Sequence, residues 1–248
     1  MSALEIKQLN KHYQLDAIRV PALIDINLNI APQRFTVLSG PSGSGKTTLL
    51  NLIGCIDRPD SGEIIIAGQQ VKQLSDDALA DFRSRHIGFI FQNFNLLPVL
   101  TAYENIEYPL LLAKVPAAKR KARILSLLDA VGLSDKARNL PGQLSGGQRQ
   151  RVAIARALAT EPQWVLADEP TANLDSHTGA SIIELMRTMQ RDLNVSFVFS
   201  SHDPQVLAAA DDAIFIHDGR LVETAAAGDA LAAKTAAIKT ISTQQVAA

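Results

Sequence analysis

Residues 40–48, Gly-Pro-Ser-Gly-Ser-Gly-Lys-Thr-Thr, fit the pattern of a glycine, four residues, a second glycine, lysine and serine or threonine without a mismatch. Glycines let such a loop curl so that successive backbone N–H groups point inward, and Lys46 adds an ammonium group. The helix that starts there directs its positive end at the same place. We therefore predict that this loop holds the phosphates of a nucleotide, with Thr47 placed to hold Mg²⁺.

The residues on both sides of the loop fit a strand–loop–helix unit. Residues 35–38 predict a short buried strand, and residues 49–53 continue as an apolar helix that ends near Gly54. The alternative is a surface turn rich in glycine and serine, which would require the motif and both flanks to coincide by chance. The sequence therefore favours a phosphate-binding loop.

The composition narrows the classes of protein to consider. The chain has 248 residues, which is enough for one large domain or two small ones. The net charge is -1, so the chain lacks the excess of basic residues that is typical of nucleic-acid-binding proteins. We therefore predict no nucleic-acid partner. The one cysteine, Cys55, excludes an internal disulfide and falls in the apolar helix, which suggests a buried structural thiol and a reducing compartment.

The hydropathy pattern contains neither a signal-peptide core at the N-terminus nor a window of about 18 apolar residues that would span a membrane. If this protein serves a membrane, we expect other chains to cross it.

Alternating apolar and polar residues predict an antiparallel sheet near the N-terminus. Residues 4–9 predict an edge strand, and residues 23–30 alternate almost perfectly. Tyr13 lies between them in a polar segment before Val20, where its ring could stack on a nucleotide base. Ordinary packing is the alternative for a single tyrosine.

Two further apolar runs, residues 62–68 and 86–91, predict strands. The second run ends on Gln92, whose amide can donate and accept hydrogen bonds at the edge of a phosphate site. A loop glutamine that faces solvent is an equally good interpretation of this residue alone.

Residues 93–159 change character and have helical spacing, chiefly in 103–113 and 117–131. We predict a helical subdomain inserted in an α/β core. The basic run at 119–123 falls within the second helix, and we assign it no ligand because such runs most often form a solvated face.

A second glycine-opened helix is predicted from Leu-Ser-Gly-Gly-Gln at residues 144–148, followed by a helix over 149–159. The N–H groups of Gly146 and Gly147, the Ser145 hydroxyl and the helix dipole together can form a second anion site. A serine–glycine turn that merely caps the helix is the alternative, because these residues are common N-caps.

Two carboxylates follow a predicted buried strand at residues 164–167, the position at which open parallel sheets bind ligands. Asp168 can hold Mg²⁺ through its water shell, and Glu169 can polarise a water for attack on a γ-phosphate. One more strand, at residues 195–200, leads to His202, although a lone histidine at such an edge is usually structural.

Taken together and in this order, the motifs resemble those of the nucleotide-binding subunit of an ABC transporter, over roughly residues 4–224. The resemblance implies an α/β fold: a P-loop NTPase (RecA-like) core with an N-terminal antiparallel β subdomain and an inserted α-helical subdomain at about 93–159. Residues 1–224 would form this domain, and residues 225–248 an alanine-rich C-terminal tail that we expect to be dispensable.

The resemblance also assigns roles to residues, with ATP and Mg²⁺ as cofactors. Tyr13 becomes the adenine-stacking aromatic, Glu169 the catalytic base and His202 the switch histidine. The implied catalytic residues are Glu169, His202, Gln92 and Lys46. The implied metal ligands are Thr47, Gln92 and Asp168. The implied nucleotide-binding residues are Tyr13, Val20, Ser39, Gly40, Pro41, Ser42, Gly43, Ser44, Gly45, Lys46, Thr47, Thr48, Gln92, Ser145, Gly146, Gly147, Gln148, Asp175 and His202. Ser201 departs from the family, which often has threonine there, so the resemblance does not define the local packing at this position.

The subfamily is also indicated, because residues 51–59, 85–98 and 101–106 strongly resemble the MacB/LolD type. Members of that type drive permeases in peptide or macrolide efflux and in lipoprotein release. This resemblance implies an ATPase subunit that drives a separate membrane permease from the cytoplasmic face of the cell membrane. A membrane-fusion or adaptor protein is a further candidate partner. The alternative is a regulatory ATPase like FtsE, which signals through a membrane partner without moving cargo.

One phosphate loop and one Leu-Ser-Gly-Gly-Gln motif per chain imply, by the same resemblance, a homodimer with two sandwiched ATP molecules. Ser145 and Gly147 of one subunit would cap the γ-phosphate held by Lys46 of the other. Hydrolysis would then remove the link between the subunits.

Overall fold

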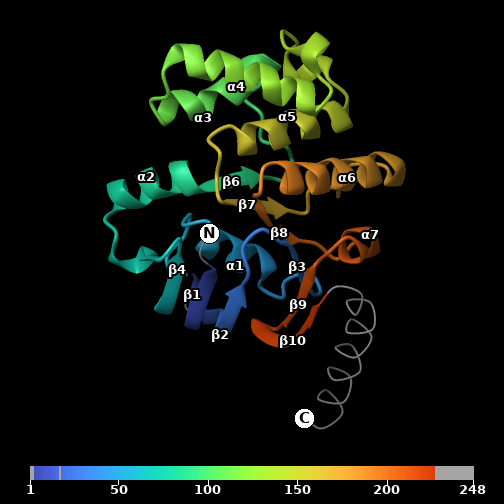
Figure 1. The fold of residues 1–248 in the computed structure, drawn as a ribbon. Coiled ribbons are helices and arrows are strands. Elements are labelled where there is room, and N and C mark those ends of the chain that lie inside the picture. The colour runs from blue at the N-terminus through green and yellow to red at the C-terminus, as the bar shows by residue number, and fades with distance from the viewer. Residues whose placement is uncertain (1–2, 17, 227–248) are drawn as a thin grey trace. The chain divides into compact units, whose positions relative to one another are not determined.

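The computed structural model describes residues 3–16 and 18–226, which form two compact units (Figure 1). Unit 1 joins the N-terminal residues up to Leu74 with the C-terminal residues from Val198 onward, and unit 2 spans Ser75–Phe197. The chain therefore leaves unit 1, completes unit 2 and returns, which brings the two ends of the described sequence into one unit.

Unit 1 contains two groups of strands and the helix that follows the phosphate loop. Its elements are β1 (Leu4–Leu15), β2 (Ile18–Ile30), β3 (Phe35–Ser39), α1 (Lys46–Ile53), β4 (Ser61–Ile66), β5 (Gln69–Gln70), the 3₁₀ turn η1 (Val71–Gln73), α7 (Pro204–Ala208), β9 (Asp212–His217) and β10 (Arg220–Ala226). Strand β8 (Ser196–Ser200) carries the chain from unit 2 back into unit 1.

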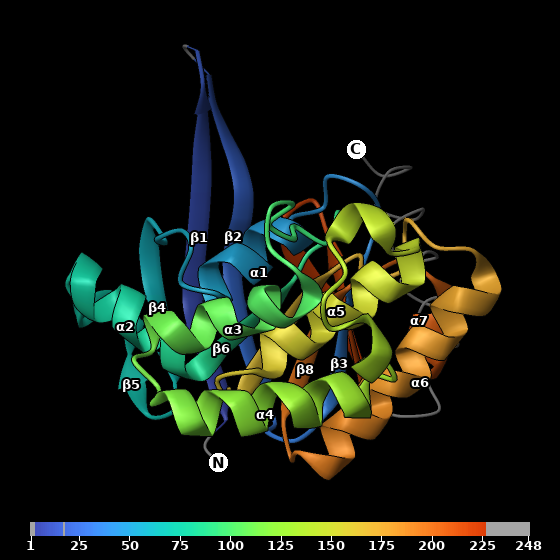
Figure 2. The same cartoon turned by 90° about the horizontal axis from the view of Figure 1, so that it is seen from above.

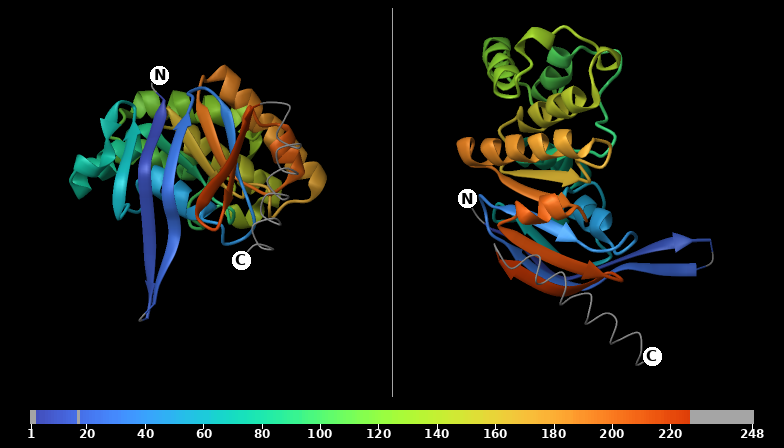
Figure 3. Two further views of the ribbon diagram at one scale, coloured as in Figure 1. Left: turned by 90° about the horizontal axis from the view of Figure 1, so that it is seen from below. Right: turned by 90° about the vertical axis from the view of Figure 1, so that its right-hand side faces the viewer.

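The first group is an antiparallel sheet in the order β2-β1-β4-β5. Strand β1 is therefore interior, and the prediction of an edge strand at residues 4–9 was wrong, because the apolar run of β4 pairs with it, Ile6 opposite Ile64. Strands β1 and β2 also extend as a two-stranded ribbon beyond β4 (Figures 2 and 3), so Tyr13 lies within a strand and not in a connecting segment.

The second group runs β10-β9-β3, with β9 parallel to β3 and antiparallel to β10. Strand β3 is entirely buried, as expected for a parallel strand covered on both faces. The rings of Phe35 and Phe199 lie 4.1 Å apart between centroids in this core. Helix α1 also has its apolar side chains buried. Cys55 is a buried thiol, as predicted, but it lies just beyond the end of α1 and not within the helix.

Unit 2 is mainly helical around a parallel pair of strands. Its elements are α2 (Asp76–His86), β6 (Ile87–Ile90), α3 (Ala102–Leu112), α4 (Ala117–Ala130), η2 (Ser134–Lys136), η3 (Pro141–Gln143), α5 (Gly146–Leu158), β7 (Trp164–Asp168) and α6 (Ser176–Asp192). Helices α3, α4 and α5 pack on one another (Figure 3). The helices predicted at 103–113 and 117–131 are therefore confirmed.

The basic run in α4 is only partly a solvated face. Lys119 and Lys121 are exposed, whereas Arg120 donates to Glu107 at 3.0 Å and Arg123 donates to the backbone oxygen of Leu158 at 2.8 Å. Two of the four basic side chains in the run therefore fasten α4 to its neighbours.

The predicted tail, 225–248, lies outside the described residues except for its first two positions, which end β10. A helix with the length and apolar character of a membrane span is absent from the residues that the structure describes.

Candidate nucleotide-binding site

The loop at residues 40–45 connects β3 to the N-terminus of α1 in unit 1. Gly45 is the N-cap residue of α1, and no side chain caps this helix end. Its φ is 105°, and a Cβ there would lie 2.6 Å from the backbone oxygen of Ala22, so only glycine fits. A helix N-terminus without a side-chain cap is suited to an anion, as the motif predicts.

Lys46 places its ammonium group over this loop. The side chain is only 7% exposed, and Nζ donates hydrogen bonds to the backbone oxygens of Gly40 and Pro41, each at 2.8 Å. The two carbonyl groups thus hold the Lys46 ammonium at the loop. The observed donor set therefore fits a bound polyphosphate.

Tyr13 and Val20 lie opposite each other in the β1–β2 ribbon of the same unit. Both side chains are exposed, Tyr13 by 40% and Val20 by 37%, so the pair offers an aromatic and an apolar surface. Tyr13 Oη donates to Asp57 Oδ2 at 3.0 Å. Burial and the hydrogen bond to Asp57 raise the pKa of Tyr13, and a hydrogen bond with Thr48 opposes them. The net effect is a raised pKa, so the phenol stays neutral.

His202 follows β8 on the side of the phosphate loop. The backbone N–H of Ser201 donates to the oxygen of Leu38 at 3.0 Å, which places the end of β8 beside the end of β3. The fully buried Ser201 accepts a hydrogen bond through Oγ from the N–H of Asp203 at 3.1 Å, so the hydroxyl at this position fixes the backbone on both sides of His202. Unit 1 thus brings together Ser39 at the end of β3, residues 40–48 and His202.

The other candidate groups lie in unit 2. Strands β6 and β7 are parallel, with Ile90 opposite Ala167, so Gln92 and the pair Asp168 and Glu169 follow the same edge. Glu169 has a φ of 45°, in the left-handed region that non-glycine residues rarely adopt. Such strain gathers at functional sites, which is consistent with a role for this carboxylate.

The Leu-Ser-Gly-Gly-Gln motif opens α5 with a capping box. Ser145 Oγ accepts from Gln148 N at 3.3 Å, and Gln148 Oε1 accepts from Ser145 N at 2.9 Å. Within one chain, Ser145 therefore caps the helix, as in the alternative interpretation, and these bonds fix the serine at the N-terminus of α5. Further along α5, the buried Gln150 donates to the backbone oxygen of Pro170 at 2.7 Å, which ties this helix to the residue after Glu169.

The turn after β7 contributes two side chains whose contacts the motif alone does not predict. Asp175 Oδ1 accepts from Thr178 N at 3.0 Å and thereby caps α6. Asn173 Nδ2 donates to the backbone oxygen of Gln92 at 3.0 Å. Asparagine in a turn is a common residue, so its sequence gives no sign of this partner. Gly147 of α5 also packs here, because a Cβ on it would lie 2.6 Å from Thr178 Cγ2.

The predicted Mg²⁺ ligands are a hydroxyl, an amide and a carboxylate, a set of hard oxygen donors that suits this ion together with nucleotide phosphates. Among the described residues, no three His, Cys, Asp or Glu side chains are grouped as a metal site. The assignment of Thr47, Gln92 and Asp168 therefore stays a prediction, in which nucleotide phosphates would supply further oxygen ligands.

Comparisons with known proteins agree with this geometry. The family model described as ABC transporter matches residues 23–172. An ABC transporter ATP-binding protein of Thermotoga maritima is 45% identical over 218 residues, which cover 88% of this chain and 93% of that protein. The macrolide export ATP-binding/permease protein MacB of Aggregatibacter actinomycetemcomitans is 44% identical over 222 residues, which cover 90% of this chain and 34% of that protein.

The structural likeness is equally extensive. A dimeric post-hydrolysis state of the ATP-binding cassette MJ0796, bound to ADP and Pi, has a TM-score of 0.83 and 41% identity, covering 90% of this chain and 98% of that one. The fold is thus that of ATP-binding cassettes, with a P-loop NTPase core. The chain belongs to the ABC transporter family, as an ATP-binding and ATP-hydrolysing subunit that uses Mg²⁺.

Proposed function

We propose that this chain is the ATPase of a MacB/LolD-type system and drives a separate membrane permease in export or in lipoprotein or peptide extrusion. The observation that carries the proposal is its 44% identity to the cassette part of proteins named macrolide export ATP-binding/permease protein. The Thermotoga relative, matched over 93% of its length, is named as an ATP-binding protein alone, which supports a permease on a separate chain.

A groove in unit 2 offers a place for that permease. It has a volume of about 910 Å³ and is lined by both apolar and charged side chains. The lining includes Phe91, Tyr108 and Leu112, together with Asp77, Asp81 and Arg156. Tyr108 and Leu112 are exposed large apolar side chains, a typical feature of docking surfaces. We assign this groove to a cytoplasmic helix of the permease, which would hold the subunit at the inner face of the cell membrane.

The roles of the site residues in this proposal follow from their chemistry. Lys46 and the N-terminus of α1 bind the phosphates, and Thr47, Gln92 and Asp168 hold Mg²⁺. Glu169 polarises the attacking water, and His202 contacts the γ-phosphate. Tyr13 and Val20 receive the adenine. Residues 1–224 form one nucleotide-binding domain in which the helices within 93–159 are the inserted subdomain.

The proposed cycle uses two copies of the chain, a state in which the related cassettes are described. Ser145 and Gly147 of one copy cap the γ-phosphate bound by Lys46 of the other, so ATP links the two copies and hydrolysis releases them. The capping box holds Ser145 at the N-terminus of α5, and the Ser145 hydroxyl, which only accepts a hydrogen bond there, can still donate its hydrogen to a phosphate oxygen.

Glu169→Gln tests this proposal, because it keeps the shape of the side chain and removes the base. Loss of general-base assistance costs about 10²- to 10⁴-fold in rate. The variant is expected to bind ATP and accumulate as a dimer, whereas the wild type returns to monomer after hydrolysis. Light scattering after size exclusion, with and without ATP, distinguishes these states.

Two results would contradict the proposal. A variant that bound ATP but stayed monomeric would refute the sandwich dimer. A variant that hydrolysed ATP at the wild-type rate would refute the role of Glu169. Ser176→Ala serves as a control, because Ser176 is exposed at the start of α6 and has no role in the proposed chemistry.

A further inference from the structure

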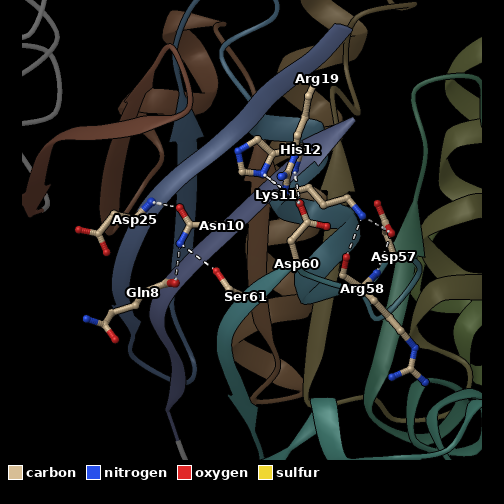
Figure 4. Close-up of polar contacts among 10 residues, drawn as sticks. All are labelled: Gln8, Asn10, Lys11, His12, Arg19, Asp25, Asp57, Arg58, Asp60 and Ser61. Atoms are coloured by element: carbon tan, nitrogen blue, oxygen red, sulfur yellow. Dashed lines mark hydrogen bonds and ion pairs between the residues drawn. The ribbon is translucent and has the colours of Figure 1, made fainter. Parts of the chain in front are cut away.

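Lys11 in strand β1 is a nearly buried lysine outside the phosphate loop. It is 8% exposed, and its Nζ donates to Asp57 Oδ1 at 2.7 Å and to the backbone oxygen of Arg58 at 2.8 Å (Figure 4). An ammonium group is costly to bury unless it is paired and hydrogen-bonded. The pair therefore holds β1 to the loop that follows α1.

The Tyr13 side chain lies next to that of Lys11, because side chains two residues apart in a strand point to the same face. The Lys11 ammonium lies 5.2 Å from the centroid of the Tyr13 ring, within range of a cation–π interaction. Asp57 accepts from Tyr13 Oη through Oδ2, at 3.0 Å, and from Lys11 through Oδ1. The ring is thus held at its hydroxyl by the carboxylate and covered on one face by the ammonium, which leaves the opposite face for a base.

The position of Asp57 along the chain connects this ring to the phosphate loop. Helix α1 begins at Lys46 and ends at Ile53, and Asp57 lies in the loop that follows directly. The element that carries the phosphate-binding lysine therefore also carries the carboxylate that orients the ring. A nucleotide bound at both places would contact two groups set by one helix and its loop.

A second set of polar contacts joins strand β1 to the loop after α1 without involving the Tyr13 ring. Asp60 Oδ2 accepts from the backbone N–H of His12 at 2.8 Å and lies 3.0 Å from His12 Nδ1 (Figure 4). His12 is adjacent to Tyr13 but points to the opposite face of the strand. Asp60 thus provides a matched comparison, since it holds the same strand to the same loop through a different face.

We infer that Asp57 and Lys11 are positioning residues that fix the Tyr13 ring as the platform for the nucleobase. This inference rests on the proposed function, in which Tyr13 stacks on adenine. Its consequence is selective: the pair sets the affinity for the base and leaves the affinity for the phosphates unchanged. If the Lys11–Asp57 pair only stabilised the fold, its loss would affect both affinities together, because the phosphate loop lies in the same unit.

The test compares ADP with inorganic pyrophosphate, which lacks the base, by calorimetric titration of the full chain. One hydrogen bond contributes about two- to tenfold in affinity, so Lys11→Met and Asp57→Ala are each expected to weaken ADP binding by about three- to tenfold. Pyrophosphate binding should stay within about twofold, the scatter allowed for an uninvolved interaction. Asp60→Ala should leave both ligands unchanged within the same limit.

Tyr13→Phe and Tyr13→Ala complete the set. Tyr13→Phe removes only the hydroxyl, and with it the hydrogen bond to Asp57, from an exposed side chain, so it should weaken ADP binding with at most a small fall in melting temperature. Equal losses for ADP and pyrophosphate in Lys11→Met and Asp57→Ala would overturn the inference. A second pattern would overturn the inference but keep Tyr13 as the base platform: unchanged ADP affinity in Lys11→Met, Asp57→Ala and Tyr13→Phe, together with a loss of affinity in Tyr13→Ala. Unchanged ADP affinity in Tyr13→Ala would overturn the platform itself.

Discussion

Asn173 Nδ2 donates hydrogen bonds to the backbone oxygen of Gln92 at 3.0 Å and to Asn93 Oδ1 at 2.9 Å. Gln92 follows β6, and Asn173 follows β7 and its two carboxylates, so one amide joins the two loops that carry the candidate groups of unit 2. Both acceptors are exposed, and the contact is therefore a link between loops and not part of the core.

Replacing Asn173 by aspartate should separate these loops. The carboxylate has the same size, but it cannot donate and would face two oxygen acceptors. We expect kcat of ATP hydrolysis to fall by about five- to tenfold, equivalent to the loss of one or two hydrogen bonds, with little change in melting temperature. Steady-state kinetics and thermal melts measure these quantities. Asn194→Asp, in the loop before β8, makes the same change of charge as a control, and an unaltered kcat in Asn173→Asp would argue against the link.

Lys46→Ala should abolish tight ATP binding. Charge-assisted hydrogen bonds contribute about 1.5 to 3 kcal/mol, so affinity should fall by at least about 10- to 100-fold. Titration with a fluorescent ATP analogue measures the effect. Lys72→Ala removes an exposed lysine from η1 and should retain wild-type affinity. Equal affinities of Lys46→Ala and wild type would show that the loop is not the phosphate site.

The Lys11–Asp57 pair predicts a dependence of stability on pH. Burial favours the neutral acid of Asp57, but hydrogen bonds from Lys11, the N–H of Arg58 and Tyr13 outweigh it and lower the pKa below 3.8. A lowered folded-state pKa stabilises the protein above the unfolded value, and the contribution is lost as pH falls through the folded value. The stabilisation should therefore be complete near neutral pH, begin to fall as pH drops into the ordinary range of aspartate, and be lost once pH is below the lowered pKa of the folded state.

Melting temperatures of Lys11→Met and wild type should reveal this contribution. At pH 7 the variant is expected to lose about 1 to 3 kcal/mol, because a partly buried carboxylate keeps no ammonium partner. The difference should shrink toward pH 3. Lys7→Met, which breaks the exposed pair with Glu5 on the same strand, should cost less than about 1 kcal/mol at either pH. A difference for Lys11→Met that stayed constant with pH would contradict the prediction.

The sequence predicted those parts of the site that are encoded locally. The phosphate loop, the strands that lead to Gln92 and to Asp168, and the glycines that open α5 each combine a short pattern with an adjacent element. The structure has those elements at the predicted places. The resemblance to a family added the roles of these groups. Local patterning thus identifies where a strand or helix ends, and in α/β folds ligands bind at such ends.

The parts that could not be predicted depend on irregular backbone or on distant contacts. Gln8 has a φ of 49°, and the pairing of β1 with β2 shifts register between Ile6 and Leu9, so period-two alternation breaks and hides the length of the ribbon. The bonds from Tyr13 to Asp57 and from Asn173 to Gln92 join residues 44 and 81 positions apart. Asp57 and Asn173 lie in turns, where their residue types are common for local reasons.

The groove of unit 2 is the basis of the last prediction, which concerns coupling to the permease. Leu112 is 63% exposed at the end of α3 and lines the groove, whereas the exposed Leu97 is not part of the lining. A carboxylate at position 112 would have to be desolvated when an apolar helix docks, and an unpaired buried charge is strongly unfavourable. Since Leu112 is exposed, Leu112→Glu should not unfold the subunit.

We therefore expect Leu112→Glu to bind ATP with wild-type affinity and to lose the permease when a tagged chain is purified from detergent-extracted membranes, by about tenfold or more in yield if Leu112 is central to the interface. Leu125→Glu is the matched control: it makes the same change at an exposed leucine, on α4 and away from the groove lining, and should retain the permease. Loss of the permease in both variants would indicate a general effect of added charge. Wild-type recovery with Leu112→Glu would place the permease elsewhere on the subunit, because a glutamate cannot be accommodated in an apolar contact without loss of affinity.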